Sequence, residues 1–125
     1  MSKAKYQNPW IQISSREWHT TDGRWRIVKD PGLGMPTSAA VQGDYVSVPD
    51  LHGRVVILNK QNVIMAVLGF NPDPAKGGAY NIPQDQWIEG IFSGTHGSYW
   101  DKDGNLYVQD WNVSGRLMKL VRVKP

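Results

Sequence analysis

The stretch Gly94–Val123, GTHGSYWDKDGNLYVQDWNVSGRLMKLVRV, predicts three consecutive antiparallel strands. Apolar and polar residues alternate through its second half, which is the pattern of strands that bury one face. The Asp103-Gly104 pair supplies the positive φ that a tight hairpin turn needs. The expected strands are Ser98–Trp100, Leu106–Gln109 and Leu117–Val123, joined by turns at Asp101–Asn105 and Asp110–Gly115.

The order of motifs in this stretch resembles one blade of an NHL-type β-propeller. Thr-His-Gly at 95–97 is followed by Asp-Gly-Asn-Leu-Tyr-Val at 103–108 and by Gly-Arg-Leu at 115–117. In that family a segment similar to Thr-His-Gly precedes the innermost strand of the blade. The Asp-Gly segment forms the turn after that strand and then the second strand, and a segment containing Arg begins the third strand. The resemblance implies four-stranded antiparallel blades, and it identifies a fold better than an activity.

The same pattern occurs a second time in residues 37–68, which read as a full blade. Val46–Asp50 aligns with Leu106–Asp110, and Gly53–Val55 aligns with Gly115–Leu117, with two extra residues in the later turn. Internal self-similarity of this kind is typical of repeat architectures. The expected strands are Thr37–Val41, Tyr45–Val48, Arg54–Leu58 and Val63–Leu68.

Residues 1–29 resemble the outer half of a blade. Trp10–Ile13 alternates, Trp18–Arg24 forms a hairpin connection around Asp-Gly, and Trp25–Val28 is the returning strand. The single domain 1–125 is therefore divided into a partial blade at 1–29, a full blade at 37–68, an inter-blade insertion at 69–93 and a partial blade at 94–125.

The insertion 69–93 contains three Pro and four Gly and is too long for an ordinary connection. Its aromatic and aliphatic residues argue against disorder. We expect it to be ordered, to cover the mouth of the propeller and to be anchored by Trp87 and Phe92. One helical turn is expected within Asp85–Gly90, after Pro83.

The predicted fold is all-β, with nine strands in groups of two, four and three. Nine strands cannot close a propeller ring, so we expect a partial propeller that is completed by a homo-oligomer of head-to-tail chains. The alternative is that the sequence is a fragment of a longer propeller. Stacked sheets should bury one face of each strand. The residues expected to be mostly buried are Val46, Val48, Val55, Ile57, Leu106, Val108 and Leu117.

The composition is that of a turn-rich globular protein, with 13 Gly, 8 Pro and no Cys among 125 residues. The absence of Cys excludes disulfides, thiolate metal sites and a Cys nucleophile. The N-terminus has no apolar leader and no segment is long enough to span a membrane, so neither a membrane partner nor an exported protein is indicated and the default location is cytoplasmic.

The net charge of +3 is spread along the chain, apart from a cluster of Arg116, Lys119, Arg122 and Lys124. Strand periodicity places Arg116, Arg122 and Lys124 on one face, opposite Leu117, Val121 and Val123, and we interpret the basic face as a solvated outer surface. Nucleic-acid binding needs a continuous basic stripe, and the sequence shows none.

Candidate binding residues follow from the side of the propeller on which each loop lies. Loops that enter the first strand of a blade, and loops between the second and third strands, share one side, where propeller ligands bind. Trp87 and Trp111 could stack on a sugar or peptide, and His52 beside Asp50 could bind a metal or act as acid and base, although a capping Asp is the commoner role. The predicted ligand-binding residues are Asp50, His52, Trp87, Asp110, Trp111 and Asn112.

Two features could hold a metal ion. Propellers similar to peptidyl-hydroxyglycine amidating lyases carry zinc histidines just before the innermost strand, and His96 lies at such a position. One His per chain cannot form a three-His site, and His96 could instead lock its connector by hydrogen bonds. Asp101-x-Asp103-Gly104-Asn105 is similar to the start of a calcium loop, but the remaining EF-hand ligands are absent.

These observations favour an NHL-type binding or scaffold module over an enzyme, because none of the nucleophile, P-loop or dinucleotide motifs is present. Its expected partners are further copies of itself and a peptide, sugar or small molecule. Two alternatives stay open: a zinc-dependent lyase similar to the amidating lyases, and a sugar-binding lectin built from few blades.

Overall fold

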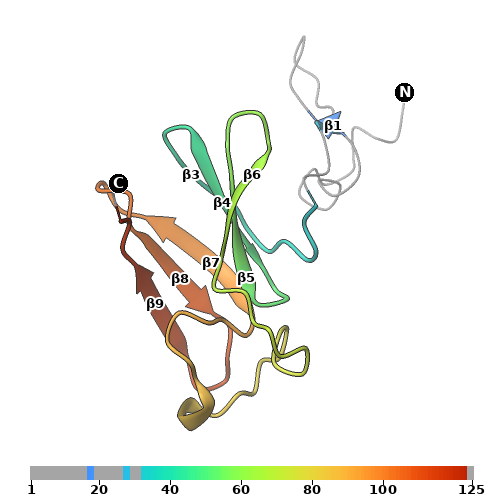
Figure 1. Cartoon of the computed structure of the whole chain (residues 1–125), viewed down its shortest axis with the longest axis vertical. Helices are drawn as coiled ribbons and strands as arrows, with labels where there is room; N and C mark the ends of the chain where they lie inside the picture. The colour runs from blue at the N-terminus through green and yellow to red at the C-terminus, as the bar shows by residue number, and fades with distance from the viewer. Residues whose placement is uncertain (1–16, 19–26, 29–31, 124–125) are drawn as a thin grey trace. The chain divides into compact units, whose positions relative to one another are not determined.

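The computed structural model describes residues 17–18, 27–28 and 32–123, which form nine β-strands in three sheets (Figure 1). Two compact units are present, Met1–Leu33 and Gly34–Pro125. The predicted all-β class and the antiparallel strand groups of four and three are confirmed. The described residues contain no α-helix, and none of their elements is a helix able to cross a bilayer.

In the first unit, β1 (Glu17–Trp18) pairs with β2 (Ile27–Val28) in parallel. The hairpin connection predicted around Asp22-Gly23 lies outside the described residues, and the sequence did not predict the parallel pair of β1 and β2. A turn signal is local, and strands of two residues with an irregular register carry little side-chain patterning to specify their pairing. The strand predicted at Trp10–Ile13 lies outside the described residues.

The first large sheet contains β3 (Ala40–Gln42), β4 (Tyr45–Asp50), β5 (Arg54–Leu58) and β6 (Ile64–Leu68). They pair antiparallel in chain order, as predicted for a full blade. The turn between β3 and β4 places Gly43 at φ +57°, a conformation that a side chain would disfavour.

The second large sheet contains β7 (Thr95–Trp100), β8 (Leu106–Asp110) and β9 (Arg116–Leu120), also antiparallel in chain order. The β7–β8 turn closes as expected: the Asp101 carboxylate accepts the backbone N–H groups of Asp103 and Asn105 at 2.9 Å. Within the described part of the chain, β9 pairs with β8 alone, so its other edge is free.

The insertion 69–93 has one short 3₁₀ turn, Gln84–Gln86, directly after Pro83; it begins before the predicted range Asp85–Gly90 and does not extend through it. Near its end Phe92 is fully buried between the two sheets. A large aromatic side chain at this position ties the insertion into the core and therefore supports its expected order.

The two large sheets pack face to face through alternate side chains. The fully or nearly buried core consists of Val55, Ile57, Phe92, Leu106 and Val108. Polar contacts join the inner strands at the same interface: the Ser47 and Ser98 hydroxyls lie 2.8 Å apart, and the Trp100 indole N–H donates to the Ala40 carbonyl at 3.1 Å. Val48 is buried, as predicted, but it pairs with Val56 and lies outside this interface cluster, and Val46 is half-buried.

Leu117 is the error in the core prediction, because it is 72 % exposed. Its neighbours Arg116 and Met118 face the first sheet, so Leu117 faces away from it. Its aligned counterpart, Val55, lies on the equivalent face of the first sheet, which the second sheet covers. Among the described residues no further sheet covers the face that carries Leu117.

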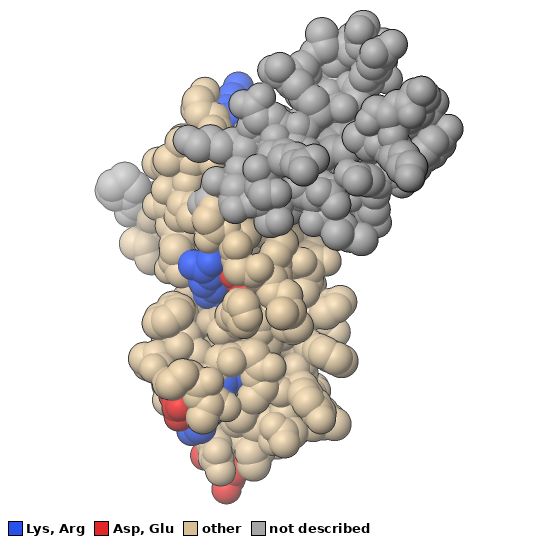
Figure 2. Space-filling model, turned by 90° about the vertical axis from the view of Figure 1, so that its right-hand side faces the viewer, with Lys and Arg blue, Asp and Glu red and all other residues tan. Residues whose placement is uncertain are grey.

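The same orientation corrects the predicted solvated basic face of β9: Arg116 and Arg122 share one side, as predicted, but that side faces the first sheet. Lys124 lies outside the described residues. The Arg116 side chain is only 9 % exposed and lies inside, whereas Arg122 is exposed and lies over the Tyr45 ring. Lys119 is on the opposite face, over the Tyr107 ring. On the side drawn in Figure 2 the charged side chains of the described residues are few and scattered. These positions do not form one basic surface.

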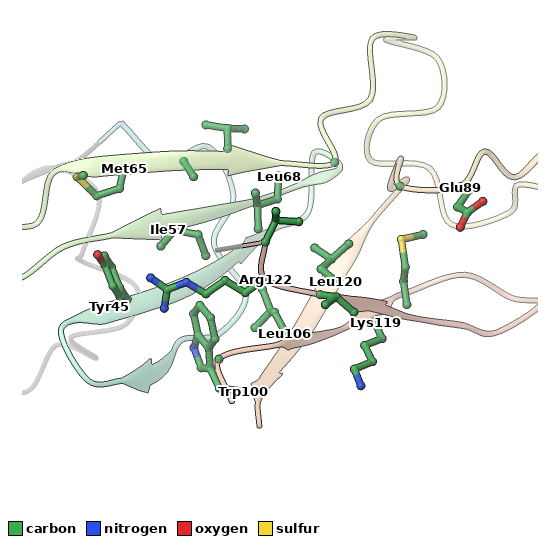
Figure 3. Close-up of a pocket in the computed structure, with 18 residues that line it drawn as sticks. Tyr45, Ile57, Met65, Leu68, Glu89, Trp100, Leu106, Lys119, Leu120 and Arg122 are labelled. Carbon is green, nitrogen blue, oxygen red and sulfur yellow. The ribbon is translucent and has the colours of Figure 1, made fainter. Parts of the chain in front are cut away.

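An apolar cleft of about 680 Å³ opens between the outer edges of the two sheets (Figure 3). Ile57 and Leu68 line it from the first sheet, and Leu106 and Leu120 line it from the second. The first sheet has four strands and the second has three. The cleft therefore lies beside the free edge of β9, where a fourth strand would extend the second sheet.

The buried position of Ile57 predicts a large cost for its truncation. Ile57→Ala should reduce the free energy of unfolding by about 2–5 kcal/mol, because it leaves a cavity between the sheets. Val41→Ala is the matched control, since Val41 is 72 % exposed, and it should cost no more than about 0.5 kcal/mol. Denaturant melts measure both, and a loss below about 1 kcal/mol for Ile57→Ala would contradict this core.

Candidate functional site

A fully buried carboxylate, Asp50, closes one end of the first sheet. It accepts the backbone N–H groups of Gly34, Met35 and His52 at 3.0–3.1 Å. Arg54 Nε lies 2.9 Å from the same carboxylate. Asp50 ends β4 and Arg54 begins β5. The Asp50 carboxylate therefore connects the β4–β5 turn to Gly34 and Met35, which precede β3.

Asp110 repeats the arrangement at the end of the second sheet. Its carboxylate accepts the backbone N–H groups of Ser93 and Gly94 at 2.6–3.1 Å and the Ser93 hydroxyl at 3.1 Å. The Arg116 guanidinium lies 3.6 Å away. The chain enters β7 directly after Gly94, so Asp110 anchors the segment that leads into its sheet, as Asp50 does.

The backbone contacts of the two turns are also equivalent. Leu51 N–H donates to the Met35 carbonyl at 2.9 Å, and Trp111 N–H donates to the Gly94 carbonyl at 2.7 Å. Each turn is thereby hydrogen-bonded to the connector of its own sheet. The sequence alignment of Asp50 with Asp110 thus corresponds to the same local structure.

These contacts lower the pKa of Asp50. Burial alone would raise this pKa, but the donated hydrogen bonds from the His52 N–H, the Arg54 side chain and the connector N–H groups outweigh it. The pKa therefore lies below its ordinary value of 3.8, and the charged carboxylate stabilises the fold.

Three of the predicted binding residues are buried. Asp50 and Asp110 are saturated by protein donors. Asn112 is only 7 % exposed, and its side-chain oxygen accepts the Ser114 hydroxyl at 3.2 Å. A direct ligand contact by these side chains stays a prediction. Their observed contacts hold the loops in place.

His52 is the exposed member of the first turn. Its Nδ1 lies 3.4 Å from the buried Asp50 carboxylate, and its side chain is 57 % exposed. The carboxylate can orient the imidazole so that Nε2 faces outward. The predicted Asp50–His52 pair is therefore present as a contact, without a described nucleophile beside it.

An exposed aromatic group, which we call the aromatic cluster, consists of Tyr80, His96 and Trp111. The Tyr80 and Trp111 rings stack with centroids 6.1 Å apart and planes at 27°. The His96 ring is tilted by 58° against Trp111 at 5.8 Å. Tyr80 and Trp111 are 59 % and 53 % exposed, so both rings present area to solvent.

Three segments far apart in the sequence bring this cluster together. Tyr80 lies in the insertion, His96 is in β7, and Trp111 follows β8. The Val113 N–H donates to the Tyr80 carbonyl at 2.8 Å, which pins the insertion to the loop that carries Trp111. The sequence predicted His96 and Trp111 but missed Tyr80, whose only signal was its place in an aromatic-rich insertion.

Trp87, the other predicted stacking residue, has a different environment. It is half-buried, and the Arg116 guanidinium lies 5.2 Å from its ring centroid. Arg116 also donates to the carbonyls of Ile88 and Ile91 at 2.6 and 2.7 Å. Trp87 therefore helps to anchor the insertion to β9. The sequence predicted a solvated outer position for Arg116, whereas its side chain lies beside the Trp87 ring.

Neither predicted metal site gains further ligands in the described residues. No group of three or more His, Asp or Glu side chains there is arranged to hold a metal ion. The Asp101 carboxylate binds Asn105 and the turn N–H groups, which lower its pKa. Zinc at His96 stays a prediction that would require ligands from other copies of the chain.

The apolar cleft and the aromatic cluster are thus the two candidate binding surfaces. The cleft lies beside the edge of β9 that is free among the described strands, and apolar side chains from both sheets line it. The cluster lies on loops that the Asp110 carboxylate and the Val113–Tyr80 hydrogen bond hold in place. Comparison with protein-family models, curated proteins and solved structures found no match.

The Asp50 carboxylate predicts a specific loss of stability at low pH. Because its folded pKa is lowered, its contribution is complete above the unfolded value of about 3.9 and is lost as the pH falls through the folded value. Asp50→Asn should cost about 2 kcal/mol or more at pH 7, since an amide cannot accept all these donors.

Denaturant melts between pH 7 and pH 2.5 measure both effects. The difference between the wild type and Asp50→Asn should shrink below about pH 4. The exposed Asp44→Asn is the control, and it should leave the pH profile nearly unchanged. An Asp50→Asn variant as stable as the wild type at pH 7 would contradict the stabilising role of the carboxylate.

Proposed function

We propose that this chain is an NHL-type β-propeller binding module whose ligand site is the loop side carrying the aromatic cluster. The observation that carries the proposal is the repeated carboxylate anchor at Asp50 and Asp110. It fixes loops of both sheets against their own strands, and loops held on a rigid scaffold are where binding residues concentrate.

The exposed rings supply the recognition surface. Aromatic side chains with two rotatable angles bury a large area at low entropic cost, which is why they are enriched in binding sites. Tyr80 and Trp111 are each more than half exposed although they stack on one another. A ligand that covers their free faces would gain area without rearranging the loops.

The module assembles with further copies of itself, head to tail. The exposed face of the second sheet, which carries Leu117 and Tyr99, is equivalent to the face of the first sheet that is covered. The free edge of β9 and the cleft beside it support the same proposal, because both would be filled by additional strands. Assembly thereby completes the partial propeller.

The assembly proposal predicts the mass in solution. Light scattering should give a multiple of 14.1 kDa. Leu117→Asp should shift the protein to the single-chain mass, because it places a charge on the exposed apolar face. Val113→Asp is the matched control, since Val113 is 78 % exposed on a loop, and it should leave the mass unchanged. A wild-type monomer would overturn the assembly.

The binding proposal is tested with a mixed panel of neutral oligosaccharides, proline-rich decapeptides and nucleosides, scored by saturation-transfer NMR. At least one class should bind, and Trp111→Ala should abolish its signal. Phe70→Ala is the control, because Phe70 is an aromatic residue 57 % exposed in the same insertion and outside the cluster. Absence of any Trp111-dependent binder in the whole panel would reject this site.

A further inference from the structure

The ligand class of the aromatic cluster can be inferred from the charge, shape and free polar groups of its surface. This step rests on the proposed function, because it assumes that the cluster is the binding site. The segments 79–82, 94–98 and 111–114 carry Tyr80, His96 and Trp111. They contain no Lys, Arg, Asp or Glu. The neighbouring Asp110 and Arg116 are buried and contact each other.

A surface without charges does not favour charged ligands. Phosphate recognition uses Arg, Lys or helix N-termini, and none of the three segments supplies a cation. Ammonium ligands are held in cages of several aromatic faces, whereas here Tyr80 and Trp111 are stacked at 27°. The expected ligand is therefore neutral.

The stacked geometry further separates the neutral classes. Proline-rich peptides dock into grooves between aromatic side chains. The Tyr80 and Trp111 centroids are 6.1 Å apart, the separation of rings in mutual contact, so no third ring fits between them. What is offered is the exposed part of each ring, on which the apolar face of a pyranose ring can stack.

Polar groups stand at the rim of this surface. Within the described residues, no hydrogen-bond partner is found for the Tyr80 hydroxyl, the Trp111 indole N–H or the His96 ring. A hydroxyl and a neutral imidazole each donate and accept. Sugar hydroxyls also donate and accept hydrogen bonds. The hydroxyls at the edge of a bound sugar ring can therefore hydrogen-bond these groups.

We propose that the aromatic cluster binds a neutral saccharide, with a pyranose ring stacked on Tyr80 and Trp111 and its hydroxyls hydrogen-bonded by His96 and the Tyr80 hydroxyl. Both rings are more than half exposed, so linked sugar units can each contact one of them. The ligand class is thus a neutral oligosaccharide, bound without a metal ion.

The test is titration calorimetry of the full chain with hexasaccharides of β-1,4-linked glucose, mannose and N-acetylglucosamine, and with a proline-rich decapeptide. At least one saccharide should bind, also in the presence of EDTA. Trp111→Ala should weaken its affinity by about tenfold or more, the factor that corresponds to ~1.4 kcal/mol. Tyr80→Ala should weaken it similarly, whereas Trp111→Phe should retain a substantial part of it.

Matched controls distinguish a loss of saccharide binding from a loss of folding. They also distinguish failure of the saccharide proposal from failure of the proposed binding module. Phe70→Ala should bind as the wild type does, and the melting temperature of Trp111→Ala should stay near that of the wild type, because Trp111 is exposed. Saccharide binding that is unchanged in Trp111→Ala, or lost in EDTA, would overturn the inference. Trp111-dependent binding of the decapeptide alone would overturn it while leaving the loop-side binding module in place.

Discussion

The structure depends on a buried carboxylate that hydrogen-bonds the backbone of the segment entering its own sheet. Asp50 and Asp110 each replace lost hydration with several N–H donors and a nearby Arg. A buried charge is tolerated only when it is satisfied in this way. The turn, the connector and the first strand of each sheet are therefore held by one side chain, and the loops that carry the candidate site inherit its rigidity.

The sequence was sufficient for the class and for the strand groups of four and three because their signals are local. Turn residues, the Asp103-Gly104 pair among them, and the apolar runs between them predicted β4 through β9, and the alignment of Asp50 with Asp110 corresponds to equivalent contacts. The side of β9 that faces the core was not predictable from alternation alone. Its two faces carry similar apolar content, and the inward face is selected by the contact of Arg116 with Asp110 and the insertion carbonyls.

The candidate site was predictable only in part, because it forms between segments far apart in the sequence. Trp111 and His96 were identified from their places in the repeat. Tyr80 lies in the insertion, which has no counterpart in the first sheet, so no repeat position indicated it. Its position follows from the hydrogen bond between Val113 N–H and the Tyr80 carbonyl, a backbone contact without a side-chain signature. Trp87 was predicted for the same reason as Trp111, as a Trp in a loop on the expected ligand side, but its ring lies against Arg116.

The carboxylate anchors have a consequence for how this surface can change over evolutionary time. Most of the donors to Asp50 and Asp110 are backbone N–H groups, which every residue except proline supplies. The side chains displayed by the anchored loops are therefore free to vary while the loop paths persist. Such a scaffold can acquire a new specificity by substitution at positions like Tyr80 and Trp111, without a compensating change in the sheets. Stability and recognition are thus encoded by separate sets of residues.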